Sequence, residues 1–88
     1  MKLIFCPSCR DMVKLQYSKR SCHCGKSWGQ YTDHIKATIG GEAIAVGIDN
    51  LTFAKALRGR IAGTYTYHSL EFDAFIFGEG PRNITKEP

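Results

Sequence analysis

Four cysteines dominate the chemistry open to this 88-residue chain, because thiolates can ligate metals, act as nucleophiles or pair as disulfides. They form two close pairs near the N-terminus, Cys6 with Cys9 and Cys22 with Cys24, and no other cysteine follows. The spacing C-x2-C-x12-C-x-C lies close to the two-pair patterns of zinc sites. The sequence therefore predicts one local metal site with these four ligands.

The two pairs differ in spacing, and each needs its own turn. In Cys6-Pro7-Ser8-Cys9 the proline fixes φ, so a tight turn can bring both sulfurs to one side. A single residue separates Cys22 from Cys24, and in a straight strand their side chains would stand about 7 Å apart. The chain must curl to bring these sulfurs together, and we expect Gly25 to take the positive φ that the curl needs.

Two alternatives remain open for the ligands and the metal. His23 lies between the second pair and could replace one cysteine, although neighbouring side chains of an extended segment point to opposite sides. Four thiolates suit iron, as in a rubredoxin-like centre, as well as they suit zinc. Zn²⁺ held by the four cysteines is the first hypothesis.

The expected compartment also favours a metal over disulfides or free thiols. The N-terminal "MKLIF" contains an apolar run of only three residues, whereas an export signal has roughly 7–15. We therefore expect a cytoplasmic protein, and in a reducing cytosol paired cysteines are more often metal ligands than disulfides. No run of 18 apolar residues occurs, so we expect no membrane-spanning helix.

Short hairpins must position the two pairs. "MKLIF" and "MVKLQY" have strand character on either side of the first pair, and "KRS" and "SWGQYTD" flank the second. Beyond Asp33 the sequence predicts two apolar strands near 35–39 and 43–48. Gly40-Gly41 between them suits the positive φ of a tight hairpin turn.

One short helix, over about 51–58, follows these strands. Asp49 or Asn50 can cap its first turn, and Gly59 can take the left-handed conformation at its end. "LEFDAFIF" then predicts one or two strands, the last well covered, and 78–88 is expected to be a flexible tail. We expect a single domain over 1–88, of a small β-rich (α+β) class, with the metal-binding part at 1–33 and a β-rich part at 34–77.

Residues 1–33 resemble the zinc ribbon and rubredoxin-like class, in which two cysteine knuckles at hairpin tips clasp one zinc ion. The resemblance lies in Cys6-Pro7-Ser8-Cys9 and Cys22-His23-Cys24-Gly25. Two features depart from the class: Arg10 stands where its knuckles commonly have glycine, and the second pair is one residue short. The whole chain, including "GKSWGQYTD" and "AVGIDN", also looks like a family of small bacterial or phage proteins that begin with such a ribbon. That resemblance implies an N-terminal ribbon followed by antiparallel strands and one short helix, and it implies no activity.

Basic and aromatic residues accompany the cysteines. The formal charge is +4, and all of the excess lies in residues 1–33, which hold six basic and two acidic residues. Four thiolates and one Zn²⁺ would lower that excess to +2. Cations beside aromatic rings can bind phosphates and stack on bases. The candidate nucleic-acid face consists of Lys14, Tyr17, Lys19, Arg20, Lys26 and Trp28. The simpler interpretation is that Trp28 and Tyr31 cover the ribbon's small core and that the lysines form an ordinary solvated face.

The predicted chemistry is structural rather than catalytic. A zinc ion with four thiolates has no open position for water, and the sequence contains no phosphate loop, dinucleotide fingerprint or carboxylate pair. We therefore expect no enzyme and no small-molecule substrate. The first hypothesis is a non-catalytic zinc protein that acts as a protein-interaction module, with a protein partner or by self-association. The alternative is a nucleic-acid-binding zinc ribbon that uses its basic and aromatic face.

Overall fold

The chain folds mostly into two small β-sheets, which the computed structural model describes over residues 1–78 and 83–87. The first sheet has the strand order β2-β1-β6-β7, and all of its neighbours are antiparallel. Its strands are β1 (Lys2–Phe5), β2 (Met12–Lys14), β6 (Ile44–Ile48) and β7 (Ala74–Ile76). The β-rich class with one short helix, predicted from the sequence, is confirmed.

The second sheet has the order β3-β4-β5-β8 and combines two antiparallel pairings with one parallel pairing. Its strands are β3 (Arg20–Ser21), β4 (Ser27–Tyr31), β5 (Ala37–Gly41) and β8 (Ile84–Glu87). The parallel pair is β5 with β8, which runs from Ala37 opposite Ile84 to Gly40 opposite Glu87. We expected a flexible tail over 78–88; a strand occupies 84–87 instead, because Ile84 is buried against the core. Residues 79–82 and 88 lie outside the described part.

A small core lies between the sheets. Ile4, Leu15 and Ile39 converge over Gly29, where a side chain would contact all three. Cys6 and Cys22 belong to the same cluster of buried residues. The cysteine turns are therefore an extension of the hydrophobic core, and their ordering is coupled to its packing.

The predicted hairpin around Gly40-Gly41 is wrong. β5 pairs with β4 and β8 in the second sheet, whereas β6 pairs with β1 and β7 in the first. The segment between them passes from one sheet to the other. Gly41 does take a positive φ of 67°, as a sharp change of direction requires. The glycine pair therefore turns the chain between two layers rather than folding one strand back on the next.

The helix is longer than predicted. α1 runs over Asn50–Ala62, and its N-terminus is capped by Asp49, whose carboxylate accepts a hydrogen bond from the Thr52 N–H at 3.3 Å. The expected left-handed end at Gly59 is not there. Gly63 ends the helix instead, with a φ of 74°. A helical Gly59 meets no obstacle, because a side chain there would lie 3.8 Å from Tyr65.

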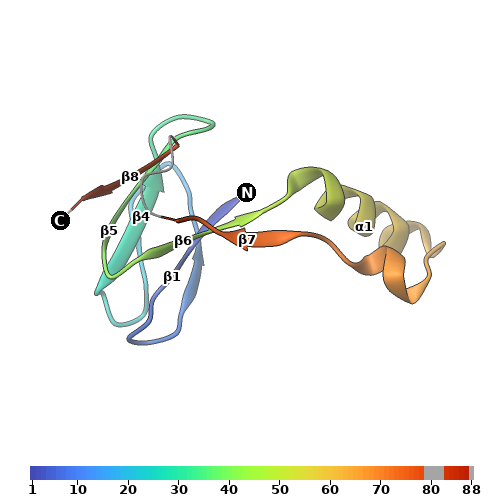
Figure 1. Ribbon diagram of the computed structural model, residues 1–88, viewed down its shortest axis with the longest axis horizontal. Coiled ribbons are helices and arrows are strands. Elements are labelled where there is room, and N and C mark those ends of the chain that lie inside the picture. Colours follow the sequence, from blue (N-terminus) through green and yellow to red (C-terminus); the bar gives the residue numbers. More distant parts are fainter. Residues whose placement is uncertain (79–82, 88) are drawn as a thin grey trace.

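α1 belongs to an arm that leaves the sheets. The arm consists of residues 50–73: α1, a short 3-10 helix η1 (Tyr67–Leu70) and the segment that returns to β7. Figure 1 shows α1 and η1 at one end of the molecule, away from both sheets, which gives the molecule its 46 Å length. The rings of Phe53 and Phe72 pack edge to face with centroids 4.8 Å apart. The arm is thus held together mainly by its own contacts.

The exposure of β7 corrects one expectation about the C-terminal half. β7 was predicted to be well covered, but all three of its residues are exposed, because β7 is the edge strand of the first sheet.

No helix in the described residues is long and apolar enough to cross a bilayer.

Glycine substitutions test the packing of Trp28. A side chain at Gly40 would overlap the Trp28 ring, which lies over this position of β5. We expect Gly40→Ala to lower the free energy of unfolding by about 1–3 kcal/mol, because the indole must move. Chemical denaturation followed by Trp28 fluorescence measures the change in the free energy of unfolding, and the emission of the folded state reports the movement of the indole. The control is Gly59→Ala, which should raise stability by about 0.5–1 kcal/mol. Wild-type stability of Gly40→Ala would contradict this packing.

Candidate metal centre

The first cysteine turn is built at the tip of the β1–β2 hairpin. The Cys6 N–H donates to the Asp11 carbonyl at 3.0 Å, and the Arg10 N–H donates to the Cys6 carbonyl at 2.7 Å. Arg10 has a φ of 60°, in the left-handed region that favours glycine. This is the position where the zinc ribbon class commonly has glycine, so the chain keeps the turn in spite of the residue.

The second turn lies at the tip of the β3–β4 hairpin and curls as the sequence predicted. Gly25 has a φ of 79°, and its N–H donates to the Cys22 carbonyl at 3.1 Å. The Ser27 N–H donates to Cys22 Sγ at 3.3 Å. The curl allows Cys24 to approach the other sulfurs although only one residue separates it from Cys22.

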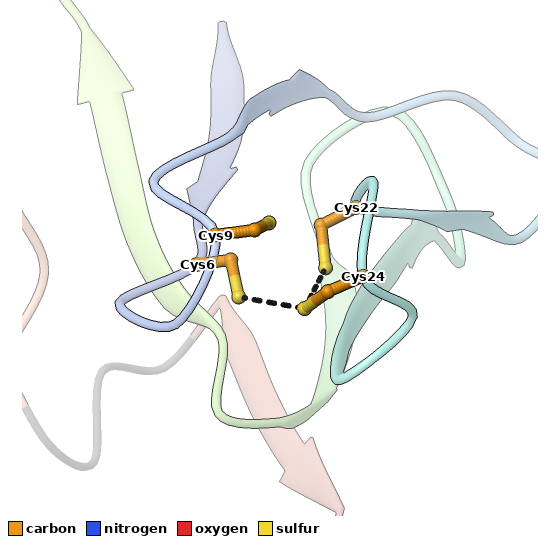
Figure 2. A group of neighbouring side chains, drawn as sticks. All are labelled: Cys6, Cys9, Cys22 and Cys24. Carbon is orange, nitrogen blue, oxygen red and sulfur yellow. Dashed lines mark hydrogen bonds between the residues drawn. The ribbon is translucent and has the colours of Figure 1, made fainter.

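The two turns bring all four sulfurs together. Figure 2 shows the side chains of Cys6 and Cys9 facing those of Cys22 and Cys24. The four Sγ atoms lie within 4.8 Å of one another; the Cys6–Cys24 distance is 3.7 Å and the Cys22–Cys24 distance is 3.5 Å. Disulfide sulfurs would be about 2.05 Å apart. Thiolates around a tetrahedral ion at about 2.3 Å lie somewhat under 4 Å apart, which the 3.5 and 3.7 Å distances match. The cluster can hold a metal ion such as zinc or iron.

The alternative ligand His23 lies outside this cluster. It is exposed, and within residues 1–78 and 83–87 the group that could share an ion consists of the four cysteines. Its backbone has another role, because the His23 N–H donates to Asp11 Oδ2 at 2.9 Å. Asp11 therefore joins the two turns: its carbonyl binds the first and its carboxylate binds the second.

The link between β5 and β6 also contacts both cysteine turns. The Ser8 hydroxyl donates to the Glu42 carboxylate, and the Glu42 N–H donates to the Lys26 carbonyl at 2.9 Å. Sequence reasoning missed both Asp11 and Glu42. An acidic residue beside a cysteine pair was the available signal for Asp11, since carboxylates often accept hydrogen bonds from turn N–H groups. Nothing local marked Glu42, which is distant in sequence from either pair.

The pKa values of three of the four thiols are shifted, and not all in the same direction. The Ser27 hydroxyl, followed by the backbone N–H of Cys9, lowers the pKa of Cys6 to about 6 in spite of burial. Burial alone would raise the pKa of Cys22. The hydrogen bonds from the Ser27 N–H and the Cys24 thiol outweigh this effect, so the pKa of Cys22 is lowered. The Lys26 N–H lowers the pKa of Cys24, yet burial and the other cysteines together raise it to about 12. Adjacent negative charges repel, so the last thiol resists ionisation until a cation is present.

A buried hydroxyl fits the same interpretation. Ser27 is 0 % exposed, and its Oγ has no complete hydrogen bond to any residue in the described part of the chain. Such an unpaired group costs about 1–3 kcal/mol unless it finds an acceptor. The same hydroxyl lowers the pKa of Cys6 and so favours its thiolate form. The surroundings of the sulfurs therefore suit thiolates bound to a cation better than neutral thiols.

Some of the basic and aromatic side chains are engaged within the fold, whereas Lys14 and Lys26 are exposed and take part through their backbone carbonyls. The Lys19 ammonium lies 4.4 Å from the centre of the Trp28 ring, which also packs over Gly40. The Arg20 guanidinium donates to the Lys14 carbonyl at 3.0 Å. Lys26 is in the second cysteine turn, where its carbonyl accepts from Glu42.

Two tyrosines complete this group. The Tyr31 hydroxyl accepts a hydrogen bond from the Lys2 N–H at 2.8 Å, and its ring lies 5.9 Å from that of Tyr17. Tyr17 remains 66 % exposed. Trp28 and Tyr31 thus cover the fold, as the simpler interpretation expected, and Tyr17 is the more exposed ring.

Comparisons of this chain with protein-family models, curated proteins and solved structures found no match. The resemblance of residues 1–33 to the zinc ribbon class rests on the four clustered cysteines and on the turns that hold them. The arrangement of the four cysteines is compatible with a zinc ribbon.

The strained turn gives a stability prediction. Arg10→Gly should raise the free energy of unfolding by about 0.5–1 kcal/mol, because glycine adopts a positive φ without the steric cost that arginine has. Arg58→Gly is the matched control: inside α1 the same replacement should lower stability by about 1 kcal/mol. Urea denaturation of both metal-loaded variants measures the difference. A loss of stability in Arg10→Gly would mean that the arginine side chain has a role that outweighs the strain.

Proposed function

We propose that one structural Zn²⁺, held by Cys6, Cys9, Cys22 and Cys24, fastens the tips of the two hairpins and hence the two sheets. The observation that supports this is the convergence of four sulfurs within 4.8 Å. Zinc is favoured over iron because Cys24 is exposed and Cys9 is only partly buried. An iron centre so open to solvent would be vulnerable to oxidation, whereas zinc undergoes no redox change.

The ion has no catalytic role in this proposal. Four thiolates complete a tetrahedral coordination sphere, so no position remains at which water or a substrate could bind. The metal instead contributes folding free energy. Such a contribution matters in a chain of 88 residues, whose hydrophobic core alone gives little net stability.

The fold serves as a protein-interaction module, and the arm is its docking element. Within α1, all of which is described, only Ala56 is buried. Leu51 and Ile61 are each 82 % exposed. Burying one such side chain on a partner contributes about 1.5–3 kcal/mol. The arm therefore carries apolar surface that its own fold leaves uncovered.

The partner is a protein with carboxylates around an apolar patch. α1 contains Lys55, Arg58 and Arg60 and no acidic residue, so two copies of the helix would repel each other. A groove of about 190 Å³ beside the helix is lined by Phe53, Leu57, Arg60 and Phe72, among others. An apolar side chain can enter this groove while a neighbouring carboxylate pairs with Arg60. Nucleic acid is a poorer match, since phosphates gain nothing from the exposed leucine and isoleucine.

Metal removal tests the structural role of zinc. Native mass spectrometry should find one zinc ion per chain. Stripping it with a chelator should abolish the β-sheet circular dichroism and lower the melting temperature, because the ligands belong to the buried core. Cys24→Ser should have nearly the same effect. Chelator saturated with zinc is the control. An unchanged melting curve after confirmed loss of the metal would contradict the structural role, and an iron mass would contradict zinc.

A displayed peptide library tests the arm. Selection on the zinc-loaded protein should enrich peptides that combine Asp or Glu with large apolar residues. Their affinity, measured by fluorescence anisotropy, should fall at least tenfold in the double variant Leu51→Ser, Ile61→Ser and in Arg58→Glu. The control is Met12→Ser, which removes an exposed apolar side chain from β2.

Three outcomes would contradict this docking proposal. The first is a set of selected peptides without acidic residues or with affinity unaffected by the arm variants. The second is self-association of the free protein in analytical ultracentrifugation. The third is salt-sensitive binding to single-stranded nucleic acid that Lys19→Ala, Arg20→Ala abolishes, which would favour the basic face instead.

A further inference from the structure

Ser27, the first residue of β4, holds an unusual position. It is 0 % exposed, and its hydroxyl completes no hydrogen bond within the described residues. Buried polar side chains nearly always have a partner, so an unpaired one needs an explanation. Its cross-strand neighbour is Gly41, which has no side chain and allows β5 to approach the Ser27 backbone closely. Ser27 thus has no route to solvent.

A sulfur of the cysteine cluster lies next to this residue. The Ser27 N–H donates to Cys22 Sγ at 3.3 Å. The hydroxyl belongs to the same residue as this N–H and is buried with it beside the cysteine cluster, in which Cys6 is also fully buried. A hydroxyl hydrogen turns freely about its bond to carbon, so it can point at whichever acceptor is present. A thiol is a weak acceptor, but a thiolate is a strong one.

We propose that Ser27 is a positioning residue of the metal centre, whose backbone N–H donates to the Cys22 thiolate and whose hydroxyl donates to a thiolate of the same cluster. This inference rests on the proposed four-thiolate metal site. Ser27 then stabilises thiolates of the cluster in the form that binds the ion. Outer groups of this kind commonly change metal affinity by 10–100-fold.

The test uses the full chain and the substitution Ser27→Ala, which removes the hydroxyl but keeps the backbone N–H. Zinc affinity is measured by competition with a chromophoric chelator. We expect the variant to bind one zinc ion about tenfold more weakly than the wild type. Ser21→Ala is the matched control, because Ser21 precedes Cys22 but its side chain is exposed. It should keep the wild-type affinity.

A second measurement separates the hydroxyl contact from a general loss of stability. Co²⁺ bound to thiolates gives charge-transfer absorption that depends on the electron density at sulfur. At saturating Co²⁺ the spectrum of Ser27→Ala should be shifted from that of the wild type and of Ser21→Ala. Because every molecule is then loaded, weaker binding or partial unfolding of the free protein does not affect this comparison.

The outcomes are distinct. Wild-type affinity in Ser27→Ala would overturn the inference, and so would weaker binding with an unshifted Co²⁺ spectrum, which indicates a packing role alone. If the wild type bound neither zinc nor cobalt, the proposed metal site itself would fail. Weaker binding together with a shifted spectrum would establish the hydroxyl as a donor to the centre.

Discussion

Two hairpins hold four cysteine sulfurs within 4.8 Å of one another, so their thiolate forms repel each other. The packing of the two sheets depends on how this repulsion is balanced. Ionising all four thiols without a cation is unfavourable, and the raised pKa of Cys24 reflects burial and the neighbouring cysteines. Yet Asp11, which binds both turns, and the Cys6 and Cys22 side chains in the core prevent the turns from separating. A bound cation relieves this conflict, so ion binding and the packing of the two sheets are coupled.

The molecule therefore consists of two parts with different sources of order. The two sheets share a small core of side chains such as Ile4 and Leu15, extended by the cysteine cluster. The arm has its own contacts, of which the Phe53–Phe72 ring pair and the Asp49 cap are the clearest. Under the proposed function, a partner bound to the arm would therefore leave the cysteine cluster untouched.

Local chemistry made part of this fold predictable. The four cysteines, the curl at Gly25 and the cap at Asp49 follow from residue types a few positions apart. The glycine pair misled the prediction, because positive φ marks a turn but does not say which sheet the next strand joins. Ser27 and Glu42 gave no local signal either, since their importance comes from segments that meet only in the folded chain.

The arm enters and leaves the first sheet at neighbouring points. It begins after β6 and ends before β7, and Ile48 and Ala74 face each other as cross-strand partners. In topological terms the arm is an insertion within an ordinary antiparallel pair, which a short reverse turn could close. Replacing the arm by such a turn would therefore keep the pairing of β6 with β7 and leave the cysteine turns in place.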